Sequence, residues 1–383
     1  MSDNTYLFTA DVHMKRRTWT NSTLLQGDAT AAFGKVCRDC SFMAEGGIII
    51  GGDLFDSNRP TSQDLIDTID IIKGNFDHCY YISGNHDSVQ PAYLEAFRDV
   101  SDYPDLELFD LDTPPSPQYY TGAYRYTLAG VRWLASASEL YQRLKEIVDN
   151  WKEWRTEEDK LYIVLHNTFQ HLLGFDGAYD LTIDMIKDLC GEEKIYFLVG
   201  HIHTRDTTVY NSAGAYIHSP GSLYPLSADK MGEPCFGSMI DLNNSQIQDI
   251  PSNVRRYETI NISDIPVDNI IEALDTAGLK PEHVWSLPTF IRLVVPESYD
   301  QPILIPETKD YVFKLDRQLA HTEASVARQS SYSIQQAIKD ELSDSANREM
   351  AMDMAEEILA SDDPMSTIEK WFDFWQVKKV TPC

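Results

Sequence analysis

The feature that most constrains the fold of this chain is a series of short, almost continuous apolar runs in its N-terminal part. Runs of this kind, in which apolar and polar residues do not alternate, are typical of strands buried on both faces of an α/β sheet. We predict strands at residues 6–10, 48–50, 79–82, 162–165 and 195–199. Helical patterns separate these runs, so this part of the chain is predicted to form an α/β fold.

Three of the intervening segments have helical spacing. One covers residues 31–44, and Thr61 or Ser62 can cap a second, which ends at Lys73 and Gly74. The third has apolar side chains on one face, which we expect to pack on the sheet: Leu140, Leu144, Ile147, Val148, Trp151 and Trp154.

The sequence changes in character near its C-terminal third, where prolines become frequent. Strand-like runs at residues 290–295 and 311–315 lie among these prolines, which indicates a small, separate α+β domain. A polar stretch then leads to a helical C-terminus. We predict a main domain at residues 1–255, the small domain at 256–330, and a linker with C-terminal helices at 331–383.

The chain is strongly acidic, with 60 acidic against 32 basic residues and a net charge of −28. This charge disfavours non-specific adhesion to nucleic acid or to an anionic membrane. It does not exclude an enzyme that acts on nucleic acid through bound metal ions, because those ions are then the largest local charges. If DNA is the substrate, a partner is expected to help to hold it.

The apolar runs and the cysteines bear on location. No run approaches the ~20 residues of a membrane helix, and no basic segment followed by an apolar one opens the chain. We therefore expect a cytoplasmic protein with no membrane segment. The six cysteines are then expected to be reduced, and the pair Cys37 and Cys40 is interpreted as ordinary thiols of a helix, with a metal or redox role as the alternative.

Five short polar motifs follow the predicted strands. In open α/β sheets, ligands bind beyond the carboxyl ends of the strands, so the five can converge on one site. They are Asp11-Val12-His13, Gly52-Asp53-Leu54-Phe55-Asp56, Gly84-Asn85-His86-Asp87, His166-Asn167 and Gly200-His201-Ile202-His203. Carboxylate, imidazole and amide groups of this kind suit Mn²⁺, Fe²⁺ or Zn²⁺.

The spacing of these residues favours a centre for two metal ions. Asp11 and His13 are two residues apart, as are His201 and His203, so an extended backbone would point each pair to one side. Asp53 follows two glycines and is the natural bridging carboxylate. Two ions that share it can clamp a phosphoryl group for in-line attack. The candidate metal ligands are Asp11, His13, Asp53, Asn85, His166, His201 and His203.

His86 directly follows a candidate ligand, which would hold it at the site without requiring it to bind metal. That placement suits a general acid that protonates the leaving oxygen. His218 lies just before the loop formed by residues 219–222. Two roles are open for His218: a position near the site, or ordinary hydrogen bonding in the core or a loop.

The order of these motifs resembles that of the calcineurin-like metallophosphoesterases. The run Gly52-Asp53-Leu54-Phe55-Asp56-Ser57-Asn58-Arg59-Pro60 and the later Ser219-Pro220-Gly221-Ser222 are similar to the SbcD nuclease branch. This branch includes the nuclease subunit of the eukaryotic double-strand-break repair complex. The resemblance implies a four-layer sandwich of two mixed β-sheets flanked by helices, followed by a capping domain and C-terminal helices.

The same resemblance implies a Mn²⁺-dependent DNA nuclease, with Mg²⁺, Fe²⁺ or Zn²⁺ as other possible metals. Its action would be 3′–5′ exonuclease on double strands and endonuclease on single strands or hairpins, in DNA repair and recombination. By that pattern one metal takes Asp11, His13, Asp53 and His203, the second takes Asp53, Asn85, His166 and His201, and His86 is catalytic. The implied partner is an SbcC-type coiled-coil ABC ATPase that binds a nuclease homodimer in a heterotetramer. The source would be bacterial or viral, with the host cytoplasm as the location if viral.

One position departs from part of the family. Several members have histidine three residues after the bridging aspartate, where this chain has Asp56. We hypothesise that Asp56 orients a ligand histidine.

The role of the basic residues near the motifs has two interpretations. Lys15, Arg16 and Arg17 follow the first ligands directly, and both a solvated loop and a contact to DNA phosphate are open. Arg59 and Arg205 are further candidates for DNA contact.

The C-terminal apolar stripe of Ile368, Trp371, Phe372 and Trp375 predicts a helix that either docks on its own domain or binds a partner groove. The resemblance implies the coiled coil of the ATPase. Two other functions stay open: a phosphatase or phosphodiesterase that acts on a non-DNA ester, and an inactive scaffold.

Overall fold

A computed structural model describes the structure of this chain. It covers residues 4–14, 27–87, 106–112, 126–169, 180–210, 214–226, 230–265, 269–279, 287–296, 298–299, 303–305 and 308–317. By its contacts the chain divides into two compact units. The first contains Met1–Ile260, Asp264–Leu293 and Leu304–Lys314, and the second contains Asn261–Ser263, Val294–Ile303 and Leu315–Cys383.

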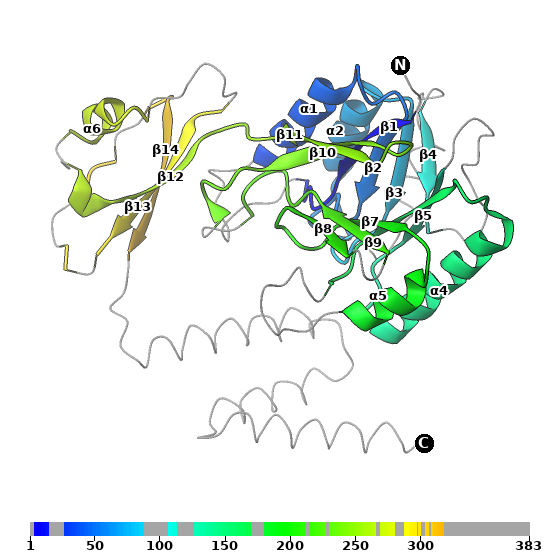
Figure 1. Ribbon diagram of the computed structural model, residues 1–383. Helices are drawn as coiled ribbons and strands as arrows, with labels where there is room; N and C mark the ends of the chain where they lie inside the picture. The colour runs from blue at the N-terminus through cyan, green and yellow to red at the C-terminus, as the bar shows by residue number, and fades with distance from the viewer. Residues whose placement is uncertain are drawn as a thin grey trace, which may run out of the picture. The chain divides into compact units, whose positions relative to one another are not determined.

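A six-stranded mixed sheet lies in the first unit (Figure 1). Its order is β11-β10-β1-β2-β3-β4, and β1 to β4 run parallel while β10 and β11 are antiparallel to their neighbours. The strands are β1 (Thr5–Thr9), β2 (Gly47–Gly51), β3 (His78–Ile82), β4 (Glu107–Asp110), β10 (Phe236–Asp241) and β11 (Gln246–Pro251).

A five-stranded mixed sheet also lies in the first unit, in the order β5-β6-β7-β9-β8. Only β8 is antiparallel to its neighbour. The strands are β5 (Tyr126–Val131), β6 (Lys160–Leu165), β7 (Ile195–Val199), β8 (Asp206–Tyr210) and β9 (Ala215–Ser219). A separate three-stranded sheet contains β12 (Tyr257–Asn261), β13 (Thr289–Val295) and β14 (Tyr311–Arg317), and the chain between β12 and β13 includes α6 (Ile270–Thr276).

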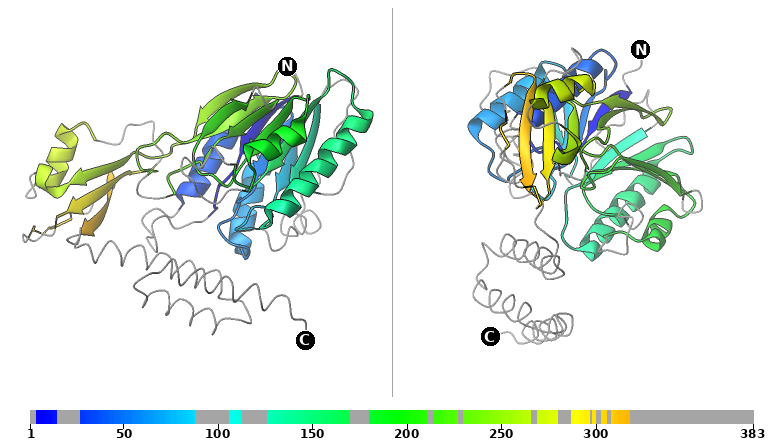
Figure 2. Two further views of the ribbon diagram at one scale, coloured as in Figure 1. Left: turned by 60° about the horizontal axis from the view of Figure 1, so that its bottom comes forward. Right: turned by 90° about the vertical axis from the view of Figure 1, so that its left-hand side faces the viewer.

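Helices cover the outer faces of both large sheets, as Figures 1 and 2 show. Helices α1 (Asp28–Cys40) and α2 (Ser62–Lys73) pack on the six-stranded sheet, and α4 (Ala137–Trp154) and α5 (Ile183–Cys190) on the five-stranded sheet. The layers are therefore helix, sheet, sheet and helix, which confirms the predicted four-layer sandwich.

The alternation of side chains along the strands explains why both faces had to be apolar. Leu7 packs toward α1 and α2, while its neighbours Tyr6 and Phe8 enter the core between the two sheets. In the other sheet, Ile163 faces the helices and Val164 faces the middle layer. Each strand thus contributes to two cores, and the uninterrupted apolar runs are the consequence.

The predicted helices are found with small shifts of their ends. Helix α1 begins three residues earlier and ends four residues earlier than predicted, at Asp28 and Cys40. Helix α2 begins after Thr61, whose side chain and that of Asp64 form a reciprocal capping box. Cys37 and Cys40 lie in α1, as interpreted from the sequence, and the structure shows them as free, buried thiols. Among the described residues, no helix is both long enough and apolar enough to cross a bilayer.

A buried ion pair anchors the start of α1. Arg255 Nη2 lies 2.5 Å from Asp28 Oδ1, and Tyr257 donates a hydrogen bond of 2.6 Å to Asp28 Oδ2. The side chains of Asp28 and Arg255 are 0% and 4% exposed. The N-terminus of the helix and the segment that enters β12 are therefore joined by one carboxylate.

We expect Asp28→Ala to lower the free energy of unfolding by about 3–5 kcal/mol, because it leaves a buried guanidinium without its counter-ion. Urea denaturation followed by circular dichroism measures this change. The matched control is Asp39→Ala, which breaks a largely exposed pair with Lys35 and should cost about 1 kcal/mol or less. Equal effects of the two variants would contradict the expected importance of the buried pair.

Candidate metal centre

The segments that follow β1, β2, β3, β6 and β7 carry the five motifs. Backbone hydrogen bonds join the first two of these segments: Asp11 N–H donates to Gly52 O at 3.1 Å, and His13 N–H to Asp53 O at 2.9 Å. His201 N–H donates to both carboxylate oxygens of Asp11 at 3.0 and 3.1 Å, which joins the β7 segment to the β1 segment. The motifs are therefore connected to one another at the carboxyl ends of parallel strands.

The backbone at these motifs differs from the sequence prediction. Asp11, His13, Asp53 and His201 have φ values of 51°, 46°, 50° and 78°, in the left-handed region that side chains rarely adopt. Asp11 and His13 thus share a site through a left-handed turn, and the predicted extended alternation is wrong, also for His201. Unusual backbone of this kind persists only where the surrounding contacts enforce it, and it concentrates at functional sites.

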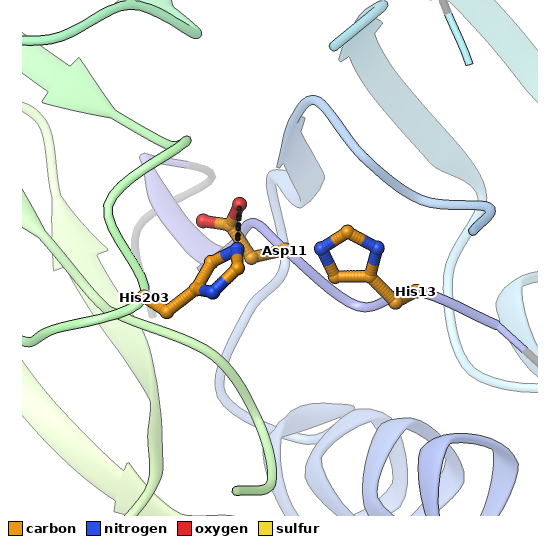
Figure 3. A group of neighbouring side chains, drawn as sticks. All are labelled: Asp11, His13 and His203. Carbon is orange, nitrogen blue, oxygen red and sulfur yellow. Dashed lines mark ion pairs between the residues drawn. The ribbon is translucent and has the colours of Figure 1, made fainter. Parts of the chain in front are cut away.

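Three overlapping groups of side chains could each hold a metal ion. Within each group one ligand atom per residue lies within 4.8 Å of the others: Asp11, His13 and His203; His13, Asp53 and His86; Asp11, Asp53 and His166. Figure 3 shows the first group, in which His203 comes from the segment after β7 and faces Asp11 from the segment after β1. Asp11 and Asp53 each belong to two groups, so the two carboxylates link the whole cluster.

The distances within the cluster are short. His166 Nε2 lies 3.2 Å from Asp53 Oδ2 and 3.9 Å from Asp11 Oδ1. His13 Nε2 lies 3.7 Å from Asp53 Oδ2, and His203 Nε2 lies 3.5 Å from Asp11 Oδ1. The side chains of Asp11, Asp53, His13 and His166 are at most 2% exposed, whereas His203 is 36% exposed. The cluster thus has a buried base and a rim open to solvent.

Three of the imidazoles are oriented through Nδ1. His166 Nδ1 lies 2.7 Å from Gly51 O, His13 Nδ1 lies 3.1 Å from Asp56 Oδ1, and His201 Nδ1 lies 2.9 Å from Asn85 Oδ1. Each partner is an oxygen that accepts, so Nδ1–H donates. The opposite nitrogen, Nε2, then carries the lone pair, which is the arrangement found for histidines that bind metal.

The buried Nε2 of His166 shows that the cluster fits a cation. It has no hydrogen-bond partner of good geometry although it is fully enclosed, and it points toward two carboxylates. An imidazole lone pair against two negative groups is unfavourable unless a proton on Nε2 or a metal cation lies between them. Carboxylate and imidazole donors in this number suit a borderline divalent metal.

The ionisation of the cluster leads to the same conclusion. Burial lowers the pKa of His166, but the carboxylates of Asp53 and Asp11 outweigh this effect and raise that pKa to about 9. Burial raises the pKa of Asp53, but His166 and His13 outweigh this effect and hold that pKa well below its usual range. Burial raises the pKa of Asp11 to about 7, and burial with His166 nearby lowers that of His201 to about 4. Without a cation the cluster thus retains a proton, which a divalent metal would displace.

Comparison with known proteins identifies the family. A sequence model of the calcineurin-like phosphoesterases matches residues 5–205, more than half of the chain and all five motifs. The chain belongs to the calcineurin-like phosphoesterase family. The family resemblance inferred from the motifs is thereby confirmed.

Several relatives of this phosphoesterase are described as "DNA double-strand break repair protein Mre11". The one from Sulfurisphaera tokodaii is 26% identical over 208 residues, covering 54% of this chain and 50% of that protein. The one from Methanosarcina acetivorans is 35% identical over 98 residues, covering 24% of this chain and 16% of that protein. The chain therefore spans half or less of the length of these relatives.

Among solved structures, a dimetal phosphatase from Danio rerio is similar to this phosphoesterase with a TM-score of 0.41 and 10% sequence identity. The similarity covers 64% of this chain and 95% of that one.

The remaining predicted residues of the phosphoesterase have varied surroundings. His86 is 40% exposed, and its backbone N–H donates to Asp53 Oδ1 at 2.9 Å. Arg59 is exposed, while the guanidinium of Arg205 pairs with Asp249 at 2.7 Å. His218 is buried and bonds Thr207 and Ser238, so it has the ordinary hydrogen-bonding role. The other candidates for DNA contact and for partner binding lie outside the described residues: Lys15, Arg16, Arg17, Ile368, Trp371, Phe372 and Trp375.

Two acidic residues of the phosphoesterase, the buried Asp87 and the partly exposed Asp180, were not singled out from the sequence. Asp87 accepts hydrogen bonds from the backbone of two motif segments, and burial raises its pKa to about 6. Asp180 accepts from the N–H and the hydroxyl of Thr168 and from Asn167, which fixes the segment after His166. Asp87 could have been noticed as the last residue of its motif, whereas nothing in the sequence around Asp180 points to this role.

Proposed function

We propose that this chain is a Mn²⁺-dependent DNA nuclease that processes DNA ends in repair and recombination. The observation that carries the proposal is the cluster in which Asp11 and Asp53 face a set of buried imidazoles that are oriented through Nδ1. The choice of DNA is supported by the Mre11 relatives. Exonuclease action on duplex ends and endonuclease action on single strands are part of the same proposal.

We propose two groups of ligands from the family pattern, and the neighbouring side chains of Asp11, His13, Asp53, His166 and His203 support them. One position would be held by Asp11, His13, Asp53 and His203, and the second by Asp53, Asn85, His166 and His201. When bound, two divalent cations would supply positive charge that polarises the phosphoryl group and stabilises the transition state. The rim formed by His86 and His203 is the accessible side, so a phosphodiester would approach there.

His86 is the proposed proton donor to the leaving oxygen. Its Nδ1 lies 3.3 Å from the backbone oxygen of Asp56, so Nδ1–H donates and the ring is held in one orientation. When the ring is doubly protonated, the opposite nitrogen, Nε2, also carries a proton and is the atom that can deliver it on the exposed side of the site.

A partner is proposed for the rest of the chain. An acidic protein of net charge −28 needs help to hold DNA, and an SbcC-type ATPase bound at Ile368, Trp371, Phe372 and Trp375 would supply it. Lys15, Arg16, Arg17 and Arg59 are the proposed DNA contacts of this chain. The proposal includes a homodimer within a heterotetramer and a cytoplasmic location. The main domain would end at residue 255, and the small capping domain would end at residue 330.

The test is hydrolysis by the purified chain of blunt duplex DNA, single-stranded circles and bis-p-nitrophenyl phosphate, each with Mn²⁺ or EDTA. Cleavage of DNA that requires Mn²⁺ supports the nuclease. Hydrolysis of the small ester while DNA stays intact, also after the ATPase partner is added, would contradict it. The alternative, a phosphodiesterase or phosphatase that acts on another ester, would then replace it.

Asp56 offers a further prediction at this site. Because its carboxylate accepts the Nδ1–H of His13, we expect Asp56→Asn to weaken Mn²⁺ binding by about 10- to 100-fold. Isothermal titration with Mn²⁺ measures the effect, and Asp112→Asn, at a carboxylate paired with Arg132, is the control. Unchanged affinity and rate in Asp56→Asn would exclude the orienting role.

A further inference from the structure

Asp87 connects two of the segments that carry the metal centre. Its carboxylate is buried, with Oδ2 2.8 Å from the backbone N of Leu54 and Oδ1 2.5 Å from the backbone N of Gly84. Leu54 directly follows Asp53, and Gly84 directly precedes Asn85. One side chain therefore fixes the segment of the bridging carboxylate against the segment of Asn85 and His86.

The two segments approach each other so closely that their relative position has little freedom. A Cβ added at Gly84 would lie only 2.1 Å from Asp53 Oδ1, so no other residue fits there. The backbone of Asp53 is left-handed, with φ of 50°, and needs contacts to maintain it. The N–H groups of Leu54 and Gly84 both point at Asp87, which accepts from each.

The chemistry of these two bonds requires a carboxylate. Two N–H donors converge on the two oxygens of Asp87, and an ionised carboxylate accepts at both. An asparagine of the same shape offers one oxygen, and its NH₂ group would face one of the two donors. The replacement of a single atom therefore breaks one of the two connections while the volume stays the same.

We propose that Asp87 is a positioning residue that sets the distance between Asp53 and the Asn85–His86 pair, and that it touches neither metal nor substrate. This inference rests on the proposed function. Because Asp87 supports the segment of Asn85, it should matter most for the second metal position, which uses Asn85, His166 and His201. The first position shares Asp53 but draws its other three ligands, Asp11, His13 and His203, from other segments, so it should be affected less.

The test compares Asp87→Asn with the unmodified chain and with Asp159→Asn. Asp159 is a similarly buried carboxylate that accepts a backbone hydrogen bond of 2.7 Å from Thr156, remote from the metal centre. Binding of Mn²⁺ is followed by titration calorimetry, and kcat and KM are measured on bis-p-nitrophenyl phosphate. We expect Asp87→Asn to weaken one of two Mn²⁺ sites at least tenfold and to lower kcat at least tenfold, with KM nearly unchanged. Asp159→Asn should change none of these.

Several results would overturn the inference. Full Mn²⁺ affinity and kcat in Asp87→Asn would do so, and so would an equal loss at both Mn²⁺ sites. If that variant fails to fold by circular dichroism, Asp87→Glu decides, because it keeps both acceptor oxygens and displaces them by one methylene. A folded Asp87→Glu chain with two normal sites and normal kcat would refute the positioning role. An unmodified chain that binds no Mn²⁺ would instead refute the proposed function itself, and this inference with it.

Discussion

Replacement of Asp53 by asparagine is expected to reduce the rate of Mn²⁺-dependent phosphodiester hydrolysis by roughly three orders of magnitude. The variant would lose several kcal/mol of electrostatic stabilisation of the transition state, and each ~1.4 kcal/mol lowers the rate about tenfold. Asp53 faces His13 and His166 with one oxygen and accepts the His86 N–H with the other. Its negative charge is maintained even though it is buried, because His166 and His13 lower its pKa. It is the carboxylate that the two proposed metal positions share.

The asparagine variant separates charge from structure. The new side chain would keep an oxygen that can accept from His86 N–H, so the fold should survive, as circular dichroism and thermal unfolding can show. Mn²⁺ titration should reveal the loss of both high-affinity sites, since the carboxylate is shared. Asp159→Asn again controls for the removal of one buried charge. Activity within tenfold of that of the unmodified chain would mean that Asp53 does not bridge two metals.

The architecture could be predicted from the sequence where apolar patterns are strong. Residues 195–199 are predicted as a strand and form β7 with the same limits. A strand buried on both faces is a continuous apolar run, so its ends can be located in the sequence. Edge strands escaped prediction. Strand β11, Gln246–Pro251, exposes most of its side chains and has a polar sequence, so its pairing with β10 depends on the sheet and not on local preference.

The candidate site shows the same division between chemistry and conformation. The motif residues that could hold metal are recognisable by type, and the structure brings Asp11, His13, Asp53, His166 and His203 together. The backbone that achieves this was not predictable. The left-handed turns at Asp11 and Asp53 are fixed by hydrogen bonds between segments far apart in the sequence, such as that from Asp11 N–H to Gly52 O. Local propensity disfavours such turns, and only the assembled sheet supplies their partners.

His86→Gln is expected to lower the rate of DNA cleavage by about 10²- to 10⁴-fold, the usual contribution of a positioned general acid. Glutamine keeps the backbone N–H that donates to Asp53 and a polar side chain of similar reach, but it cannot release a proton near neutral pH. The loss should therefore appear in kcat, and the Mn²⁺ affinity should stay within a few-fold of that of the unmodified chain.

The leaving group makes this prediction specific to proton transfer. A deoxyribose oxygen leaves poorly without a proton, whereas p-nitrophenolate is a stable anion that needs none. The ratio of the two rates should therefore separate two roles for His86, which lies close enough to His13 and Asp53 to be a metal ligand as well. For a general acid, His86→Gln slows DNA cleavage far more than hydrolysis of bis-p-nitrophenyl phosphate. Equal losses on both substrates, accompanied by a fall in Mn²⁺ affinity, would show instead that His86 binds the metal, and the proton donor would then have to be another group on the exposed rim.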